Sequence, residues 1–260
     1  MDQFQIVVPT QNSYKVLPQL IESIKGQTWA KWKVFFVDGE SNLKNVRWLK
    51  KLCSTDDRFF YLKQKENNHG IFGAMNQALE IIDFNNWIIF WGSDDWVMSP
   101  NTFEKLSLEI KKFSNLKLDL IICKGKYYNL DKTFYKNTQF KFKQNNLILH
   151  NQEYKRHIFL GFTPPHQATL INPNLFKKYK YDDNFKITGD LDFFCRICYE
   201  QKLLIAVLDL YLVSISRGGI SSKKHIRRFS EVIKSYNRIF GKLFFIPFIT
   251  RYILKIFNII

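Results

Sequence analysis

The sequence has few cysteines, and their positions argue against disulfides and against a structural zinc site. Only four occur in 260 residues, at positions 53, 123, 195 and 198. Cys195 and Cys198 have C-x-x-C spacing, but no second pair is present to complete a tetrahedral metal site. Cys53 and Cys123 each stand alone in an apolar segment. We therefore expect small core residues in a protein that works in a reducing compartment.

The chain also lacks the glycine-rich motifs that hold phosphates. No G-x-G-x-x-G follows the first predicted strand, and no G-x-x-x-x-G-K-[ST] occurs anywhere. A dinucleotide-binding domain and a P-loop enzyme therefore lose their main support. The segment PTQNSYKVL, which follows the first strand, has no glycine either. Its composition argues against a sugar-nucleotide pyrophosphorylase.

Long apolar runs are missing as well. The N-terminal MDQFQIVVPT has neither the basic start nor the apolar length of a signal peptide, so we expect a cytoplasmic chain. The most apolar segment, at 243–260, contains Arg251, Lys255 and Asn258 at helical spacing. A spanning helix needs about 20 apolar residues, and an arginine near its centre costs roughly 3 kcal/mol. We expect this segment to lie in the plane of an anionic membrane surface. The alternative is a helix packed on the rest of the protein or on a second copy.

Acidic residues are scarce relative to basic ones. Lys and Arg number 39 against 23 Asp and Glu, which gives a formal net charge of +16. This balance predicts an anionic partner: nucleic acid, a membrane face or a phosphorylated ligand. Hydrophobic residues make up 46% of the chain, enough to bury a sizeable core. The length fits one large domain, or one domain with an appendage.

Short apolar runs alternate with helical patterns through the first half of the chain. We expect strands at 4–8, 33–38, 59–62, 87–91 and 119–123, and helices at 15–24, 46–52, 71–82 and 102–113. Such alternation predicts an α/β fold with a mainly parallel central sheet flanked by helices. The segment 124–165 is less regular, and we interpret it as strands and loops beside the sheet. Ordered elements resume at 166–171, 175–179, 189–200 and 203–208.

Polar residues follow three of the predicted strands. They are Pro9–Asn12, Asp38–Ser41 and Ser93–Asp95. Ligands of such sheets bind outside the carboxyl ends of the strands, so we expect these residues to share one site. The adjacent carboxylates of Asp94 and Asp95 repel each other unless a cation intervenes, and oxygen ligands favour Mg²⁺ or Mn²⁺. The alternative is that Asp94 starts a turn and Asp95 caps the next helix.

Eight segments occur in an order shared with one known family. They are IVVPTQN (6–12), LPQLIESIKGQTW (17–29), VFFVDGES (34–41), NNHGIFGAMNQAL (67–79), IIFWGSDD (88–95), HQATLINPNLF (166–176), DDNFKITGDLDFFCRI (182–197) and RGGIS (217–221). In this order the chain resembles an inverting family 2 glycosyltransferase with the GT-A fold, of the bacterial surface-polysaccharide type. The resemblance implies a GT-A domain at 1–221, with a nucleotide-sugar half at about 1–123 and an acceptor half at about 124–221. A basic amphipathic helical tail would follow at 222–260.

The resemblance also implies roles for individual residues. Asp190 matches the catalytic base, with a helix N-cap as the alternative reading. Asp94 and Asp95 match the region that binds a divalent metal, Mn²⁺ or Mg²⁺, and the donor. Residues implied to bind the nucleotide sugar are Pro9, Thr10, Asn12, Asp38, His69, Gly70, Asn76, Ser93 and Asp94. Possible contacts to the acceptor or the diphosphate are His166, Asp192 and Arg217. For His166 a bond to a loop carbonyl is an equal reading, and Asp192 can instead pair with Arg196.

Three glycines stand where relatives often carry acids. Gly92 precedes the Asp94–Asp95 pair, Gly39 follows Asp38, and Gly73 replaces the aspartate of a GIYDAMN-type segment. None of the three removes the implied metal or base, although Gly73 bears on donor choice. Gly92 is the one hint of a homologue that has lost catalysis.

The resemblance implies a metal-dependent transfer of a sugar from a nucleotide sugar, with UDP as the expected nucleotide. The expected acceptor is a polyprenyl-diphosphate-linked glycan of O-antigen, capsule or exopolysaccharide synthesis. We expect a peripheral protein on the inner face of the plasma membrane, held by its tail, with a homodimer possible and no nucleic acid partner. The rival class is a nucleic-acid-binding protein, because 124–143 interleaves aromatic and basic residues.

Overall fold

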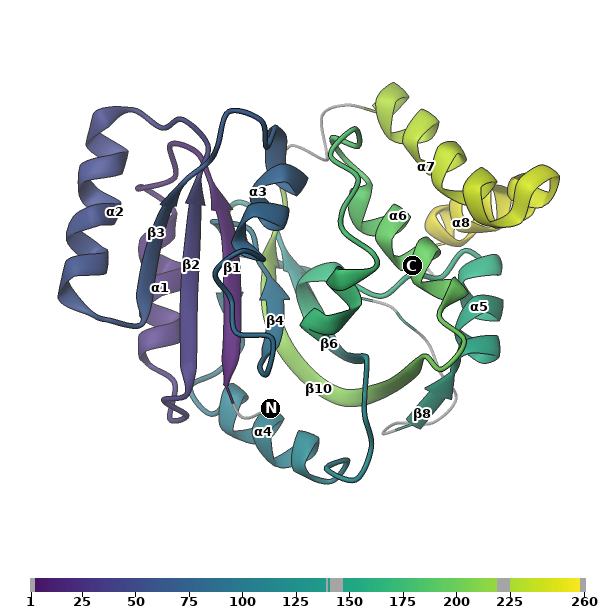
Figure 1. Cartoon of the computed structure of the whole chain (residues 1–260), viewed down its shortest axis with the longest axis horizontal. Coiled ribbons are helices and arrows are strands. Elements are labelled where there is room, and N and C mark those ends of the chain that lie inside the picture. Colours follow the sequence, from purple (N-terminus) through teal and green to yellow (C-terminus); the bar gives the residue numbers. More distant parts are fainter. Residues whose placement is uncertain (1–2, 139, 141–146, 219–224, 258–260) are drawn as a thin grey trace.

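The alternating pattern builds one central sheet that carries helices on both faces (Figure 1). The structure is a computed structural model that describes residues 3–138, 140, 147–218 and 225–257. The strands are β1 (Phe4–Thr10), β2 (Trp32–Asp38), β3 (Phe59–Lys63), β4 (Trp87–Phe90), β5 (Trp96–Val97), β6 (Leu120–Tyr128), β7 (Phe134–Asn137), β8 (Leu147–His150), β9 (Thr169–Ile171) and β10 (Leu204–Ser216). The expected α/β class is confirmed.

Helices connect the strands and follow the last one. They are α1 (Leu17–Lys25), α2 (Leu43–Thr55), α3 (Gly70–Ala78), α4 (Thr102–Lys111), α5 (Asn151–Phe159), α6 (Gly189–Arg196), α7 (His225–Phe240) and α8 (Phe245–Ile256). Short 3₁₀ turns are η1 (His166–Ala168), η2 (Pro173–Lys177), η3 (Ile197–Tyr199) and η5 (Gly241–Phe244). The helix predicted at 175–179 is the turn η2, and α5 was not predicted.

The sheet order places the first four parallel strands side by side. The order is β3-β2-β1-β4-β9-β6-β10-β5, with β7 on β6 and β8 on β10. Thr10 pairs with Asp38 in register, so the carboxyl ends of β1 and β2 are adjacent. β6 and β10 run parallel and are longer than expected, to Tyr128 and Ser216, because each supplies the other with a ladder partner. The loops after β1, β2 and β4 therefore open at the same edge of the sheet.

The two faces of the sheet bury two separate cores. Successive side chains of one strand point to opposite faces of the sheet, so Val7 and Val8 of β1 are buried in different cores. Helices α1, α2 and α4 cover one face, and α3, α5, α6 and α7 cover the other. Three of the cysteines are buried in these cores, and all four are free thiols, as the sequence predicted.

The C-terminal helices pack on the second core rather than standing apart. Val232 and Tyr236 of α7 are fully buried there, and α7 lies against α6 while α8 lies against α5 and α7 (Figure 1). Arg251 of α8 donates hydrogen bonds to the Gly161 carbonyl and to Thr163 Oγ1, at 3.2 and 2.9 Å. The polar stripe of α8 therefore faces the protein. The predicted boundary at residue 221, as well as Asn258, lies outside the described residues.

The outward face of the same two helices is apolar. Exposed side chains include those of Ile226, Phe229, Ile233, Phe245, Ile249, Ile253, Ile256 and Phe257. Within the described ranges, no helix has the length and apolar character needed to cross a membrane.

A glycine marks the place where α8 docks. Gly161 has φ +82°, and a Cβ there would lie 2.7 Å from the Arg251 backbone nitrogen. We expect Gly161→Ala to cost about 1–2 kcal/mol for the left-handed backbone and about 1–3 kcal/mol more for the overlap. Gly241→Ala is the matched control, because Gly241 has φ +51° but nothing within 4 Å. Urea unfolding of both variants measures the difference, and equal costs would contradict tight docking of α8.

Candidate active site

The loops after β1 and β2 are tied to each other at the edge of the sheet. Asn12, whose φ of 53° is tolerated by asparagine, accepts a bond from the Asn42 backbone N–H at 2.9 Å and donates its own N–H to Ser41 Oγ at 2.7 Å. Thr10 is buried, and its hydroxyl oxygen has no partner among the described residues. Such an unpaired buried hydroxyl at a strand end is available to a ligand.

Asp38 is buried beneath these loops and surrounded by protein donors. Its carboxylate accepts bonds from the Ser41 hydroxyl and backbone N–H, from Asn45 Nδ2 and from Tyr61 Oη. Only 1% of the residue is exposed. The carboxylate therefore holds the turn into α2, and the base-reading role implied by the resemblance stays a prediction.

The carboxylates of Asp94 and Asp95 converge over Gly92. A Cβ on Gly92 would lie 3.0 Å from Asp94 Oδ1 and 3.2 Å from Asp95 Oδ2. Asp94 is partly exposed, and its carboxylate accepts no hydrogen bond from the described residues. The preceding Ser93 Oγ donates to the Pro9 carbonyl at 3.2 Å. The glycine thus leaves the two carboxylates the space that an acid at this position would fill.

Asp95 is the buried member of the pair. It is 2% exposed, and it accepts bonds from the backbone N–H groups of Gly92 and Ser216 at 2.7 and 3.3 Å. Burial and the neighbouring charge of Asp94 raise its pKa to about 8. An ionised Asp95 therefore needs a cation nearby.

The pair fits a divalent cation that is shared with a ligand. No group of three or more His, Cys, Asp or Glu side chains gathers in the described part of the chain. The protein would therefore supply two carboxylates, and phosphate oxygens and water would supply the remaining ligands that Mg²⁺ or Mn²⁺ needs. The reading of Asp95 as a helix cap is wrong, because the residue before α4 is Asn101.

The other two glycines that replace acids make room for one loop. A Cβ on Gly73 would lie 2.5 Å from the backbone carbon of Asn68, and one on Gly39 would lie 2.8 Å from Gln64 Oε1. The Gln64 side chain in turn donates to the carbonyls of Asn68 and Gly70. The loop 64–70 therefore lies closer to β2 and α3 than acids at positions 39 and 73 would allow.

The start of α3 faces a lysine that the sequence analysis missed. His69 precedes the helix, is exposed, and makes no capping bond through its side chain. Gly70 has φ +69°, and a Cβ there would lie 3.9 Å from Lys186 Nζ. Lys186 also donates to the Asp183 carbonyl at 2.7 Å. A cation and a helix N-terminus thus lie together, an arrangement that favours an anion.

Asn76 is bonded within the fold, and the donor contact that the resemblance implies for it stays a prediction. Its Nδ2 donates to the Tyr181 carbonyl at 2.8 Å, and its Oδ1 accepts from the Tyr181 N–H at 3.0 Å. Both ends of the amide are used to join α3 to the segment before α6.

Asp190 lies in the first turn of α6. The N-cap of α6 is Thr188, so the reading of Asp190 as the N-cap is wrong. The Asp190 carboxylate is partly exposed and accepts no hydrogen bond from the described residues. Burial and the charges of Asp95 and Asp190 together raise the pKa of Tyr127 to about 12. Both acids therefore lie near one tyrosine.

His166 is a buried residue whose side chain is bonded to a tyrosine hydroxyl rather than to the loop carbonyl that the sequence suggested. Its Nε2 and the Tyr181 hydroxyl are 2.8 Å apart, and its ring stacks on Phe90. Burial lowers its pKa, against the opposing charge of Asp190, so the ring is neutral at pH 7. The acceptor contact proposed for His166 is not supported by this geometry.

Asp192 is likewise structural. It is 0% exposed and binds Arg196 at 2.7 Å and Arg238 of α7 at 2.9 Å. The i,i+4 pair with Arg196 was expected, whereas the second cation comes from the tail. Each carboxylate oxygen is paired with a cation, and the acceptor contact implied for Asp192 stays a prediction.

Arg217 lies at the end of β10, next to the residue that bonds Asp95. Its guanidinium donates to Asn129 Oδ1 at 2.7 Å and stacks 3.6 Å from the centre of the Tyr135 ring. It is therefore held against the β6–β7 hairpin. Residues 219–224, which follow Arg217, lie outside the described residues.

The tail holds the loop that leads into α6. Glu231 of α7 accepts bonds from the backbone N–H groups of Lys186, Ile187 and Thr188, each at 2.9 Å. Burial acts to raise the pKa of Glu231, but these N–H groups outweigh it and keep the pKa below its usual value. Sequence reasoning missed this residue, because nothing in a helical pattern marks an acid that caps a distant loop.

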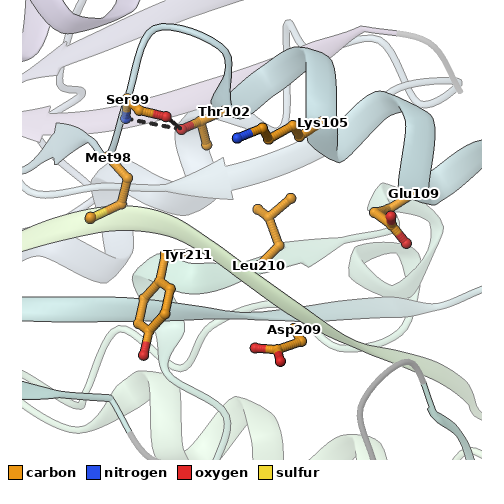
Figure 2. A pocket seen from close by; sticks show the side chains of 8 residues that line it. All are labelled: Met98, Ser99, Thr102, Lys105, Glu109, Asp209, Leu210 and Tyr211. Atoms are coloured by element: carbon orange, nitrogen blue, oxygen red, sulfur yellow. Dashed lines mark hydrogen bonds between the residues drawn. The ribbon is translucent and has the colours of Figure 1, made fainter.

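A surface hollow of the protein lies away from these residues. A pocket of about 390 Å³ lies between α4 and β10 and is lined by Met98, Ser99, Thr102, Lys105, Glu109, Asp209, Leu210 and Tyr211 (Figure 2). Ser99 and Thr102 bond each other, and Asp209 pairs with Lys124. None of the predicted site residues lines this pocket.

Comparison with known proteins matches the chain to one family. The model of the family described as glycosyl transferase family 2 matches residues 5–184. A "PGL/p-HBAD biosynthesis glycosyltransferase" of Mycobacterium bovis (strain BCG / Pasteur 1173P2) is 22% identical over 223 residues, which cover 84% of this chain and 79% of the relative. An "uncharacterized glycosyltransferase" of Methanocaldococcus jannaschii is 26% identical over 80% of this chain and 68% of its own length.

Solved structures share the fold. S. aureus TarS 1-349 matches with a TM-score of 0.69 at 18% identity, over 96% of this chain and 71% of its own. TarS 1-349 in complex with UDP-GlcNAc also gives 0.69, over 93% of this chain and 68% of its own. The mannosyltransferase PcManGT from Pyrobaculum calidifontis, in complex with GDP-Man and Mn²⁺, gives 0.61 at 13% identity, over 97% and 69%. At these identities the likeness establishes a GT-A fold.

Proposed function

Because the chain belongs to glycosyl transferase family 2, we propose that it moves a sugar from a nucleotide sugar to a hydroxyl of a glycan acceptor, with inversion at the anomeric carbon. The observation behind the proposal is the pair of carboxylates, Asp94 and Asp95, that gathers around Gly92 after β4, in a chain of this family. UDP is the proposed nucleotide, and TarS, which shares the fold, is described in complex with UDP-GlcNAc.

Each acid has a distinct part in the proposed reaction. Asp190, whose carboxylate accepts no hydrogen bond from the described residues, takes the proton of the attacking hydroxyl as general base. Asp94 and Asp95 would hold Mn²⁺ or Mg²⁺, which when bound supplies charge neutralisation for the departing nucleoside diphosphate. Lys186, beside the start of α3, adds a second positive group on the donor side. The buried Thr10 hydroxyl is open to the nucleoside.

The proposed acceptor is a polyprenyl-diphosphate-linked glycan of surface polysaccharide synthesis. The exposed apolar side chains of α7 and α8 and the net charge of +16 support docking to an anionic bilayer on its cytoplasmic side. The bilayer is the proposed occupant of this apolar face, and a second copy of the chain is the competing one. Binding of the chain to phosphatidylcholine vesicles with and without phosphatidylglycerol tests this docking, and no binding to either would contradict it.

Thermal unfolding with a panel of nucleoside diphosphates and nucleotide sugars tests the donor assignment. A ligand at a hundred times its dissociation constant should stabilise the fold by about 2.7 kcal/mol. We expect one nucleotide to raise the melting temperature in Mn²⁺ and to lose this effect in EDTA. The absence of any nucleotide-dependent shift would refute the proposal.

A further inference from the structure

The hollow between α4 and β10 has no part in the proposed reaction. Its volume of about 390 Å³ lies in the range of pockets that hold small ligands. Thr102, Lys105 and Glu109 are three and four residues apart on α4, so one face of the helix forms one wall. Leu210 points toward this wall from β10, and Met98 adds a second apolar side chain (Figure 2). The hollow therefore offers both polar and apolar contacts.

One carboxylate oxygen of Glu109 is buried without a partner. Its Oε1 accepts a bond from Lys112 Nζ at 2.6 Å, whereas its Oε2 is shielded from water and bonds to none of the described residues. Lys105, one turn earlier on the same face, is exposed and lines the hollow too. Buried polar atoms are nearly always hydrogen-bonded, so an unpaired acceptor at the wall of a hollow indicates a donor on a ligand.

The charges at the hollow favour a neutral ligand. Glu109 is paired with Lys112, and Asp209, on the β10 side, is paired with Lys124. A phosphate would be repelled by these two carboxylates. An ammonium group would meet carboxylates whose charge is already balanced, with Lys105 beside them. The ligand therefore needs hydrogen-bond donors but no net charge.

A sugar ring has the chemistry that these walls require. Its hydroxyl groups can donate to Glu109 Oε2 and accept from Lys105 Nζ. Its C–H groups can pack on Leu210 and on the ring of Tyr211. That ring is held in place by Lys126, whose Nζ lies 4.9 Å from the ring centre.

The hollow lies across β4 from the proposed nucleotide contacts. In the sheet order, β1 and β2, which end in these contacts, lie on one side of β4, and β10 lies on the other. The chain runs from Asp95 through β5 to Met98, whose N–H donates to the Leu212 carbonyl at 3.3 Å. Three extended residues span at most about 11 Å, so an oligosaccharide can reach from the metal pair to the hollow.

We propose that the hollow binds a neutral sugar unit of the glycan acceptor, away from the hydroxyl that reacts. The proposal rests on the glycosyltransferase function argued above and adds a second saccharide contact, built on Glu109 and Lys105. Such a contact favours acceptors that already carry several sugars over acceptors with a single sugar. It would therefore determine the stage of glycan assembly at which this chain acts.

Titration with simple sugars tests the binding. The probes are the methyl glycosides of glucose, galactose, mannose, rhamnose and N-acetylglucosamine, added to the ¹⁵N-labelled full chain in EDTA and without nucleotide. We expect at least one glycoside to shift the amide signals of 98–105 and 209–211. Inorganic phosphate and methylammonium, as the charged probes, should leave these signals unchanged. If no glycoside shifts them, or if only a charged probe does, the proposal is wrong.

Glu109→Gln and Glu104→Gln are the matched variants. Both glutamates belong to α4, but Glu104 is exposed, accepts a bond from Thr28 Oγ1 at 2.7 Å and does not line the hollow. We expect Glu109→Gln to weaken glycoside binding about tenfold, because a charge-assisted hydrogen bond is lost, and Glu104→Gln to bind like the wild type. Equal affinity in wild type and Glu109→Gln would overturn the proposal, as would an equal loss in both variants.

Turnover with a membrane lipid extract tests whether the bound sugar belongs to the acceptor. We expect Glu109→Gln to need about ten times more extract than Glu104→Gln for half-maximal release of nucleoside diphosphate. Equal requirements, together with weakened glycoside binding, would show that the hollow serves another glycan and would contradict the acceptor assignment. Loss of every manganese-dependent nucleotide effect, with glycoside binding intact, would instead refute the donor function and leave the saccharide site standing.

Discussion

Asp190→Asn is expected to lower the turnover number by about 10²–10⁴-fold, the usual contribution of a general base, while leaving donor binding unchanged. The amide has nearly the shape of the carboxylate but cannot take a proton from the acceptor hydroxyl. Because Asp190 accepts no bond from the described residues, the substitution breaks no contact of the fold. Transfer rates at saturating donor, together with the manganese-dependent thermal shift, measure the two effects separately.

Asp192→Asn is the control on the same helix turn. Asp192 is fully buried between Arg196 and Arg238, so its loss leaves Arg196 without an acidic partner, while Arg238 keeps Asp182. We expect a lower melting temperature, a cost of about 3–5 kcal/mol for breaking a buried pair, and a turnover number per folded molecule close to wild type. If instead Asp190→Asn keeps full activity and Asp192→Asn loses it, the assignment of the base is wrong.

Asp94→Asn is expected to abolish the manganese-dependent stabilisation by nucleotide, which is about 2.7 kcal/mol at a hundredfold excess over the dissociation constant. Asp94 is the cleaner test of the pair, since it is partly exposed and takes no hydrogen bond from the described residues. The metal-free protein should therefore unfold at the wild-type temperature. Calorimetric titration of the nucleotide with and without Mn²⁺ measures the loss.

Asp95→Asn should differ from Asp94→Asn in its stability without metal. Both oxygens of Asp95 accept backbone N–H groups, so an amide would place its own N–H₂ against one of them. We expect this variant to lose about 1–3 kcal/mol of stability without metal, in addition to the loss of metal binding. Retained manganese-dependent binding in Asp94→Asn would contradict a metal site built on this pair.

The strands and the acids at their ends were readable from the sequence because both follow local rules. A buried parallel strand is a short apolar run, and its carboxyl end is where the chain first turns polar, as at Phe90 and Asp94. The free carboxylate of Asp190 was assigned only through a family resemblance, because a helix-start aspartate has a common structural reading.

Three of the predicted site residues are polar side chains whose partners in the fold are distant in the sequence. Asn76 and His166 are both bonded to Tyr181, and Asp192 is bonded to Arg238. Each resembles a functional residue in the sequence, because a polar side chain within an apolar segment must be bonded to a ligand or to another part of the protein. Here each is hydrogen-bonded to a residue far away in the sequence, and no local pattern reveals such a bond.

The tail shows the limit of helical periodicity. The sequence pattern predicts a polar stripe and an apolar face on α8, and such a stripe is expected to face water. The structure turns Arg251 inward because Gly161 admits the backbone of α8 and Thr163 accepts the guanidinium. Glu231, which caps the loop before Asp190, could not be linked to that loop without the tertiary structure.

The most direct test of the central claim is donor turnover by the purified full chain. The protein would be incubated with Mn²⁺, each nucleotide sugar in turn and a membrane lipid extract as the source of acceptor, and the released nucleoside diphosphate would be measured. We expect one nucleotide sugar, most simply a UDP-sugar, to be consumed by the wild type, and not in EDTA or by Asp190→Asn. Release of nucleoside diphosphate by Asp190→Asn at the wild-type rate, or no release from any nucleotide sugar, would contradict the account.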